Sequence, residues 1–533
     1  MSFTSVPFAL FAVLSVILYY TAARKFQWQF LLAASLFFYA CSDIRYLIFI
    51  VIVTGSAYFV TRRFTSMQAK QAEHLKSHPE LTKDEKKAFR KKTGTACSRW
   101  LLAVVLLDFG ILFAFKYLNF FITNINAIIG IFSKTASIAT LNIILPLGIS
   151  FYIFQTVGYV ADVYFGKYEA EKNPFRLALF VSFFPQLIQG PIGRYDLMAP
   201  TLYARHEFDP RAVSSGVERM LFGYFKKIVV ADRIAPAVAA ICGAPDKYRG
   251  AMVAVGMLFY AIQLWCDFTG GIDITIGIAE TLGISLSENF NRPFFSKNIA
   301  EYWRRWHITL GTWFRDYTFY PLSTSKGMMK LTKATKKHFG SGAAKRVPVY
   351  LASAILWFAT GAWHGAKWNY IAWGLYHGVL ICMSTLFEEP LAKLTKALRI
   401  KTDCISWEIF RMLRTFILCV IGRLIFMGQG IRSSIWMIRS MVFDHSKVYN
   451  IVDEFSLSGR EWRVLIFGCL LLLAVSIAQE IMERRGSTGD VREWLAKQNI
   501  VFKWLVMAAG LAFIAICGVY GSGAGASFIY EQF

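Results

Sequence analysis

Long apolar stretches alternate with shorter polar stretches along nearly the whole chain. About 20 apolar helical residues cross a hydrocarbon core of about 30 Å, and several of these stretches approach or exceed that length. The clearest are residues 3–20, 44–60, 100–118, 141–163, 216–241, 251–284, 348–388, 408–428, 463–481 and 502–520. Some are long enough to fold back as two spans. The pattern therefore predicts an all-α polytopic membrane protein with about 11 transmembrane helices and additional re-entrant segments.

Composition supports this class. Of the 533 residues, 56% are hydrophobic and 16% aromatic, which excludes an ordinary soluble domain. The first apolar stretch has no small-residue cleavage site and is followed by further apolar runs, so we expect a first span that is kept. The nine cysteines show no C-x-x-C pattern, which predicts small core residues and neither a disulfide framework nor a metal site. We expect one integral domain, residues 1–533.

The formal net charge of +24 comes mainly from the polar connections between apolar stretches. Residues 61–99 hold eleven Lys and Arg against four Asp and Glu, and residues 326–347 are basic with no acidic residue. Because cytoplasmic loops carry an excess of positive charge, we expect cytoplasmic loops at 61–99, 326–347, 389–407 and 484–500, and an N-terminus outside the cytoplasm. This placement explains the charge better than nucleic-acid binding does.

The stretch EYWRRWHITLGTWFRDY, Glu301 to Tyr317, concentrates polar chemistry in an apolar chain. Projected as one helix, it separates into two arcs. The first arc holds Trp303, Trp306, His307, Leu310, Trp313, Phe314 and Tyr317. The second holds Glu301, Arg304, Arg305, Thr309, Thr312, Arg315 and Asp316, with Glu301 and Arg305 spaced for an ion pair. An interfacial amphipathic helix would account for the Trp and Arg but gives His307 no task, and a lone histidine is more often a packing residue than a catalyst.

A second constellation is TGAWHGAKWNYIAWGLYHG, Thr360 to Gly378. His364 lies between Gly361 and Gly365, where the backbone can be closely approached and the ring can face a cavity. It can equally be a polar turn residue at an interface. Asn369 is a candidate orienting residue in the same stretch. His377 lies in a plain apolar helix, so we expect a structural role for it.

Two further stretches in the centre of the chain place polar groups or chain breaks at membrane depth. Asp267, Asp273 and Glu280 are embedded among small and apolar residues, and such carboxylates are functional candidates, although an internal ion pair with a central arginine is an equal alternative. The short run from Phe175 to Gln189 leads into SFFPQLIQGPIGRY, which suggests a re-entrant segment lining a cavity. We place a catalytic core at residues 175–388.

Four stretches together resemble the membrane-bound O-acyltransferase family, and within it the bacterial alginate O-acetyltransferase-like branch. They are SFFPQLIQGPIGRY, DFTGGIDITIGIAETLGISLSENFNRPF, EYWRRWHITLGTWFRDYTFYPL and WFATGAWHGAKWNYIAWGLYHG, and the terminal GVYGSGAGASFIYEQF is similar to the closing segment of that branch. The resemblance implies a multi-span helical fold around a central tunnel in a bacterial plasma membrane. Carried over by position, the two functional histidines of the branch fall on His307 and His364.

The resemblance implies transfer of a short acyl group such as acetyl from a cytoplasmic thioester to hydroxyls of an exported polysaccharide. Acetyl-coenzyme A or another thioester would be a substrate, with no tightly bound cofactor, and an exported SGNH-hydrolase-like protein would be the partner. We expect His364 to be the general base and His307 to orient the proton or polarise the thioester carbonyl. Trp303 and Trp306 would line the tunnel, and Arg304, Arg305 and Asp273 would hold it in place.

Three alternatives remain open at the level of the sequence. Within the family, the acceptor chemistry could be D-alanyl transfer to teichoic acid or O-acetylation of peptidoglycan. From a different class, a secondary transporter also has broken helices and buried charges, but such proteins are typically built from two related halves, and no internal symmetry is visible here.

Overall fold

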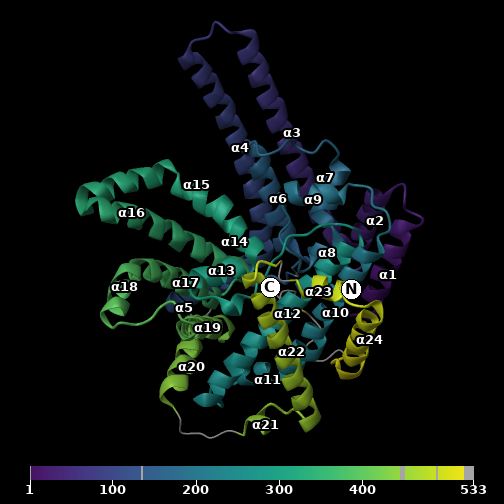
Figure 1. Ribbon diagram of the computed structural model, residues 1–533. Helices are drawn as coiled ribbons and strands as arrows, with labels where there is room; N and C mark the ends of the chain where they lie inside the picture. The colour runs from purple at the N-terminus through teal and green to yellow at the C-terminus, as the bar shows by residue number, and fades with distance from the viewer. Residues whose placement is uncertain are drawn as a thin grey trace. The chain divides into compact units, whose positions relative to one another are not determined.

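The computed structural model describes residues 2–133, 136–143, 145–444, 450–487, 490–520 and 528. Within these residues all regular structure is helical apart from one isolated antiparallel bridge between Phe290 and Trp306, which confirms the all-α prediction (Figure 1). The chain forms two compact units. One contains Phe3–Ser214 and Ile278–Ser287, and the other contains Ser215–Gly277 and Glu288–Phe533. The single integral domain stays a prediction.

The first unit is built around a buried central helix. Its helices are α1 (Val6–Tyr20), α2 (Gln27–Ala40), η1 (Ile44–Tyr46), α3 (Leu47–Ser77), α4 (Lys83–Lys116), α5 (Leu118–Phe132), α6 (Ile149–Tyr164), α7 (Pro174–Ser182), α8 (Phe184–Leu187) and α9 (Tyr195–Leu202). All residues of α6 up to Val163 are buried, and α3, α4 and α7 pack against it. Gly148 starts α6 with φ +69°, and a Cβ there would overlap the carbonyl of Leu187, so only glycine fits.

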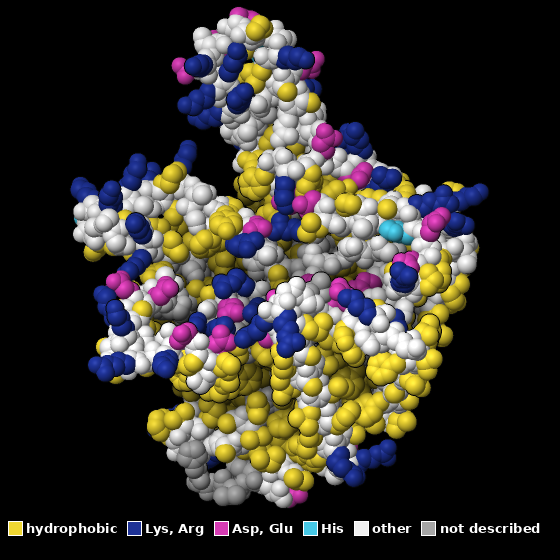
Figure 2. All heavy atoms as spheres, viewed as in Figure 1, with side chains coloured by type: hydrophobic (Ala, Val, Ile, Leu, Met, Phe, Trp, Pro, Cys, Tyr) yellow, Lys and Arg dark blue, Asp and Glu magenta, His cyan; other side chains and the backbone are white. Residues whose placement is uncertain are grey.

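The expected basic loop at 61–99 is a helical hairpin. Helix α3 runs to Ser77, and α4 starts at Lys83 behind a capping box in which Thr82 and Glu85 each bond the other's backbone N–H. Figure 2 shows Lys and Arg side chains clustered around the far end of this hairpin. The basic segment is therefore mostly helical, and its cytoplasmic placement stays a prediction.

The predicted re-entrant run from Phe175 to Gln189 consists of two short helices. Helix α7 ends at Ser182 and α8 starts at Phe184, with the break at Phe183. Residues 177 and 179–192 are buried, so the interrupted backbone is enclosed by protein, as non-helical backbone at membrane depth must be.

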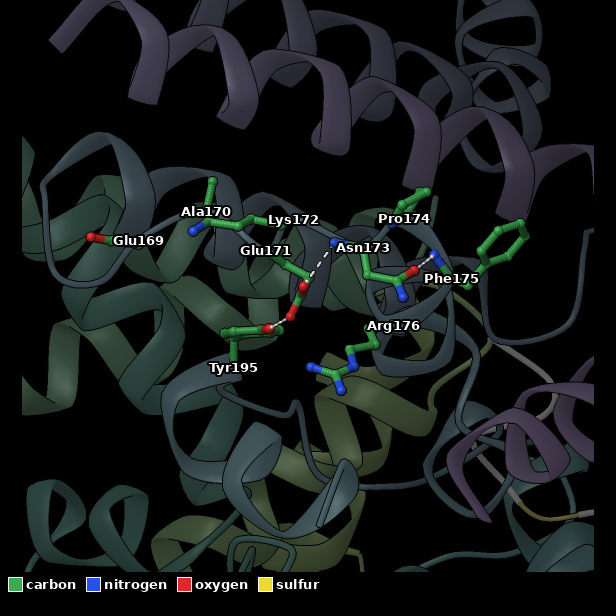
Figure 3. Close-up of a pocket in the computed structure, with 9 residues that line it drawn as sticks. All are labelled: Glu169, Ala170, Glu171, Lys172, Asn173, Pro174, Phe175, Arg176 and Tyr195. Carbon is green, nitrogen blue, oxygen red and sulfur yellow. Dashed lines mark hydrogen bonds between the residues drawn. The ribbon is translucent and has the colours of Figure 1, made fainter. Parts of the chain in front are cut away.

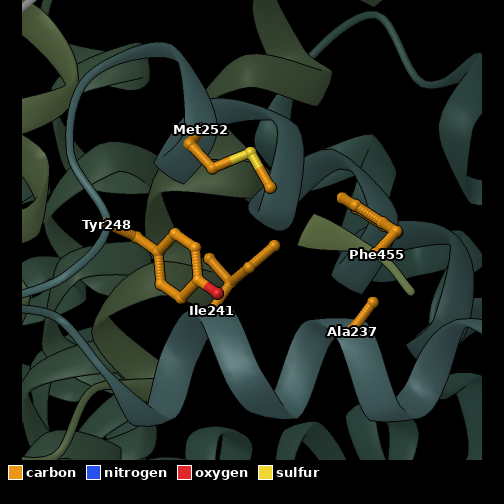
Figure 4. Packing of buried hydrophobic residues seen from close by; sticks show 5 residues of the cluster. All are labelled: Ala237, Ile241, Tyr248, Met252 and Phe455. Atoms are coloured by element: carbon orange, nitrogen blue, oxygen red, sulfur yellow. The ribbon is translucent and has the colours of Figure 1, made fainter. Parts of the chain in front are cut away.

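The second unit begins within α10 (Pro210–Tyr224). Its other elements are η2 (Phe225–Ala231), α11 (Asp232–Gly243), α12 (Ala251–Thr281), η3 (Pro293–Phe295), α13 (Ile299–Arg305), α14 (Ile308–Phe314), η4 (Arg315–Phe319), α15 (Tyr320–Ser323), α16 (Lys326–His364), α17 (Trp368–Leu386), α18 (Glu388–Ala397), α19 (Ile405–Met427), α20 (Ile431–Phe443), α21 (Ile451–Glu454), α22 (Gly459–Arg484), α23 (Val491–Ala496) and α24 (Ile500–Cys517). The segments η2 and η4 are π-helical. Figure 4 shows one buried cluster of this unit, formed by Ala237, Ile241, Tyr248, Met252 and Phe455.

The other expected loops are also partly helical. Residues 326–347 belong to α16, which is helical on both sides of Gly340 (φ +81°). Residues 389–397 lie in the exposed helix α18, and α23 lies within 484–500. Polar composition alone does not exclude a helix, because a basic segment can form a solvated helix on which no face needs to be buried.

Five helices of the described residues have the length and apolar composition of a membrane span. They are Ile44–Ser77, Lys83–Lys116, Ala251–Thr281, Gly459–Arg484 and Ile500–Cys517, and the bent pair α17–α18 would make a sixth. The expected number of about 11 stays a prediction. Much of the surface of these helices is apolar, and on α22 the side chains of Ile466, Phe467, Leu470 and Leu473 are all more than half exposed. Figure 2 shows such side chains gathered over α22, a surface suited to lipid.

Candidate active site

The helix expected over Glu301 to Tyr317 is broken at His307. Helix α13 ends at Arg305, α14 starts at Ile308, and His307 between them has φ +46° and ψ +53°. A left-handed conformation costs a residue other than glycine about 1–2 kcal/mol. Two backbone hydrogen bonds hold the break, because Ile308 N–H donates to the Asn289 carbonyl and Asn291 N–H to the Arg305 carbonyl, both at 2.9 Å.

The side chain of Asn289 fixes the tautomer of His307. Its Oδ1 accepts from Thr309 N–H at 3.1 Å and from the Thr309 hydroxyl at 2.9 Å, and it lies 3.2 Å from His307 Nδ1. Because an amide oxygen only accepts, Nδ1 must carry the hydrogen, an assignment that rests on this network. In the neutral ring the lone pair is then on Nε2. The ring is 2% exposed and lies edge-on to Phe268, with centroids 4.9 Å apart.

His364 is the last residue of α16, and its ring is enclosed by aromatic side chains. Ring centroids lie 4.8 Å from Trp373 and 5.4 Å from Phe426, both nearly perpendicular, and the residue is 4% exposed. Helices α16 and α17 approach closely here, since a Cβ on Gly361 would overlap the carbonyl oxygen of Tyr370. The predicted close approach of the backbone beside His364 is thus confirmed.

A small cavity lies beside His364. Its volume is about 30 Å³, and its lining comprises Leu264, Tyr302, Trp303, Trp306, His364, Trp373, His377, Cys419, Arg423 and Phe426. These residues come from α12, α13, the break after α13, the end of α16, the first half of α17 and the last turns of α19. Such a volume holds one or two water molecules. Any small group in the cavity therefore touches several of these side chains at once.

The ring of Trp363 contacts both predicted histidines. Its centroid lies 5.8 Å from that of His307 and 4.9 Å from that of His364. His307 itself is not part of the cavity lining. Trp303 and Trp306 do line the cavity, and Trp303 packs against Trp357 at 4.9 Å and Trp373 at 5.5 Å. The sequence thus identified two histidines and two tryptophans that the fold brings together.

The remaining predicted residues lie outside the cavity lining. Arg304 is exposed on α13. Arg305 forms the expected ion pair with Glu301 at 2.9 Å, and it lies 3.7 Å from Glu480. The Asn369 amide donates to the carbonyls of Gly428 at 2.8 Å and Ile425 at 3.1 Å, which ties α17 to the end of α19.

Two of the three carboxylates predicted in the centre of the chain, Asp267 and Asp273, form internal ion pairs, and one partner of Asp273 is an arginine, as expected. Asp273 pairs with Arg219 at 3.0 Å and with Lys226, and Asp267 pairs with Lys227 at 2.7 Å. The two lysines lie on the π-helical segment η2, which directs both toward α12. A π-helical turn is not readable from residue spacing, so the two lysine partners were not predicted.

Sequence reasoning missed His377 and Arg423 as members of the cavity wall. The ring of His377 lies 5.0 Å from Trp303 and 5.3 Å from Trp373. Asn369, Trp373 and His377 follow one another at intervals of four on one face of α17, a pattern that could have indicated it. Arg423 stands alone in an apolar run, and the argument applied to the intramembrane carboxylates applies equally to this cation.

A larger open hollow of about 640 Å³ lies in the first unit (Figure 3), lined by residues 169–176 and Tyr195. Within it the Tyr195 hydroxyl donates to Glu171 Oε2 at 2.5 Å, and Asn173 N–H donates to Glu171 Oε1 at 2.8 Å. The hollow contains none of the predicted site residues. Across the described ranges, no group of three His, Cys, Asp or Glu side chains is placed to hold a metal ion.

Comparisons with known proteins identify the family of the chain. A model of the membrane-bound O-acyltransferase family matches residues 170–430. A probable alginate O-acetylase from Azotobacter vinelandii is 30% identical over 471 residues, 88% of this chain and 83% of that protein. A peptidoglycan O-acetyltransferase from Helicobacter pylori is 28% identical over 79% of this chain and 75% of its own length. A teichoic acid D-alanyltransferase from Bacillus subtilis is 31% identical, over 46% of this chain and 61% of its own length.

Proposed function

This chain belongs to the membrane-bound O-acyltransferase family and is a membrane-embedded acyltransferase, and from that premise we propose that it moves an acetyl group from a cytoplasmic thioester to hydroxyls of an exported polysaccharide. The observation that carries the proposal is the small cavity that His364 shares with Trp303, Trp306 and Trp373. An alcohol is a poor nucleophile at neutral pH, and a positioned imidazole that removes its proton contributes ~10²–10⁴-fold in rate.

His364 is the proposed general base, because it lines the cavity directly. His307 has Nδ1–H bonded to Asn289 and its lone pair on Nε2. It would accept a hydrogen bond from the acceptor hydroxyl and so orient it. The hydrogen bond from His307 Nδ1 to Asn289 also favours the exchanged roles, with His307 as the base and His364 as the orienting residue. A hydrogen-bond acceptor that holds Nδ1–H is the usual way to orient a catalytic histidine. The aromatic surroundings of both rings would keep bulk water from the thioester.

The donor side would be the cytoplasmic face. The basic far end of the α3–α4 hairpin would raise the local concentration of a phosphate-bearing thioester such as acetyl-coenzyme A, which acts as a substrate and not as a resident cofactor. We place the N-terminus outside the cytoplasm and the protein in a bacterial plasma membrane. Arg304, exposed on α13, would face headgroups or the donor.

The acceptor would be a polysaccharide hydroxyl beyond the membrane, and an exported SGNH-hydrolase-like protein would complete the transfer. The coverage of the relatives supports this choice over D-alanylation. The alginate O-acetylase aligns over 83% of its length and the D-alanyltransferase over 61%. The closing segment GVYGSGAGASFIYEQF lies mostly outside the described residues, and its likeness to the polysaccharide branch stays a prediction.

The test is to restore the chain to a deletion strain and measure ester-linked acetate on the exported polymer. We expect His364→Ala to lose nearly all of it at wild-type expression. His338→Ala is the matched control, because His338 is an exposed histidine of the same helix α16. Full acetylation in the His364 variant would refute the assignment of the base. Ester-linked D-alanine on a teichoic acid, or acetate on peptidoglycan alone, would replace the proposed acceptor.

A further inference from the structure

Arg423 is a cation in the apolar C-terminal part of α19, and it lines the cavity beside His364. It is 4% exposed. One terminal nitrogen, Nη2, donates to the Tyr302 hydroxyl at 2.9 Å, and the guanidinium lies 5.1 Å from the ring centre of Trp306 and 5.3 Å from that of Phe294. The charged group of Arg423 is thus held by aromatic faces and one neutral hydroxyl.

No carboxylate among the described residues pairs with Arg423, and its buried Nη1 has no hydrogen-bond acceptor there. The other buried cations of this unit are compensated. Arg219, Lys226 and Lys227 each pair with a carboxylate, and Arg233 donates to two backbone carbonyls. An unpaired buried charge costs several kcal/mol. An unpaired buried arginine beside the cavity therefore lowers the stability of the fold, and this implies that it binds a group that enters only with the substrate.

The missing acceptor must enter the cavity. Because Arg423 and His364 both line this cavity, which has room for only one or two water-sized groups, an oxygen bound in it lies near both side chains. Nη2 donates to the Tyr302 hydroxyl, and Nη1 is left as a donor for such an oxygen. The requirement is an oxygen that gains negative charge during the reaction, at a place within reach of the base.

Resting on the acyl transfer proposed above, we propose that Arg423 is a catalytic residue that binds the carbonyl oxygen of the acyl thioester and stabilises the oxyanion formed on it. The acceptor hydroxyl oxygen bonds to the carbonyl carbon, its proton goes to an imidazole, and the C=O electron pair moves to the oxygen held by Arg423. When that pair returns, the C–S bond breaks, and the thiolate takes the proton from the imidazole. A thioester and an alcohol give an ester and a thiol.

If Arg423 is catalytic, its substitution lowers kcat without lowering thermal stability. If Arg423 is structural, its substitution lowers both. Removing one oxyanion donor costs ~10²–10³-fold in kcat. Removing an unpaired buried charge should not destabilise the fold, whereas breaking a buried ion pair would. We therefore expect Arg423→Gln to lower kcat about 10²-fold or more, with KM for the thioester changed little and thermal stability equal to or above that of the wild type. Arg423→Lys keeps the charge but has one terminal nitrogen in place of two, so its kcat should lie between those of the wild type and Arg423→Gln.

The experiment uses the full chain in proteoliposomes, with acetyl-coenzyme A as donor and with alginate oligosaccharides and the exported SGNH-hydrolase-like partner on the acceptor side. Thiol release, ester formation and the thermal midpoint are measured for wild type, both Arg423 variants and Arg439→Gln, an exposed arginine of α20 as control. If the wild type forms no ester, the proposed function fails. If the wild type is active and both folded Arg423 variants stay within twofold of its kcat, the role of Arg423 is overturned. Unfolding of both variants would also overturn it, because that marks Arg423 as structural.

Discussion

Replacing Asn289 with alanine should disable His307 without touching any residue of the cavity. The Asn289 amide oxygen accepts three hydrogen bonds, one from His307 Nδ1 and two from Thr309. At about 0.5–1.5 kcal/mol each, their loss amounts to roughly 2–4 kcal/mol, and the buried Thr309 N–H left behind places the effect toward the upper end. The substitution therefore removes much of what holds His307 in its left-handed conformation and the whole of what fixes its tautomer.

The fall in kcat expected for Asn289→Ala has a lower and an upper limit. A positioned imidazole contributes ~10²–10⁴-fold, so kcat cannot fall by more than that factor through His307 alone. We expect a fall of at least about 10-fold, measured as thiol release from acetyl-coenzyme A, together with a lower thermal midpoint in detergent. Asn289→Asp keeps an acceptor for all three donors and should retain most of the activity.

Asn291→Ala is the matched control for this prediction. Asn291 is exposed and contributes its backbone N–H, which alanine retains, to the same chain break. Wild-type kcat and stability in Asn289→Ala, with Asn291→Ala also unchanged, would refute the argument that Asn289 positions His307. Equal losses in both variants would instead point to the backbone of the segment and not to the amide.

Two further predictions concern other parts of the molecule. Glu454 lies in α21, outside the candidate spans, and hydrogen bonds from the Tyr248 hydroxyl and Lys247 hold its pKa below the ordinary value. Its stabilisation is therefore present above its unfolded pKa and lost as pH falls through the lowered folded pKa. The difference in thermal midpoint between wild type and Glu454→Gln should shrink from about pH 5 to about pH 3, and a difference constant with pH would contradict this. Gly361→Ala should destabilise the protein by about 1–3 kcal/mol and lower acyl transfer, because the added methyl meets the backbone of α17. Gly342→Ala in the same helix meets open space and should change neither. Equal stability and activity of the two variants would exclude a packing role for Gly361.

The elements of the site that sequence could predict are those carried by residue type. A histidine among tryptophans at 307 and another between glycines at 364 were recognisable from the chain alone, and both lie against Trp363. The break at His307 was not predictable from periodicity, because a helical projection assumes one continuous helix. Hydrogen bonds from the Asn289–Asn291 segment, more than a dozen residues earlier, impose the break.

The helical hairpin at 61–99 shows the opposite case, in which the signal was present in the chain. Thr82 and Glu85 have the spacing of a capping box, which marks the start of α4 even though the surrounding residues are charged. Charge was weighed there as a sign of a loop, but charge reports solvation and not conformation. The number of spans could not be derived for a related reason, since apolar runs such as 141–163 form helices buried inside the protein as readily as helices facing lipid.

The tight packing of aromatic rings around His364 also bears on how well the membrane retains its gradient of protons and ions. If a donor on one face of a membrane reacts with an acceptor on the other, the passage between them is a potential leak for protons and small ions. The cavity of about 30 Å³ beside His364 has room for only one or two water molecules, which is too few for a continuous file of water. The rings that surround the reacting group would then also block the passage of protons and ions. Substitutions that widen the cavity would dissipate the proton gradient before they lowered the rate of acyl transfer.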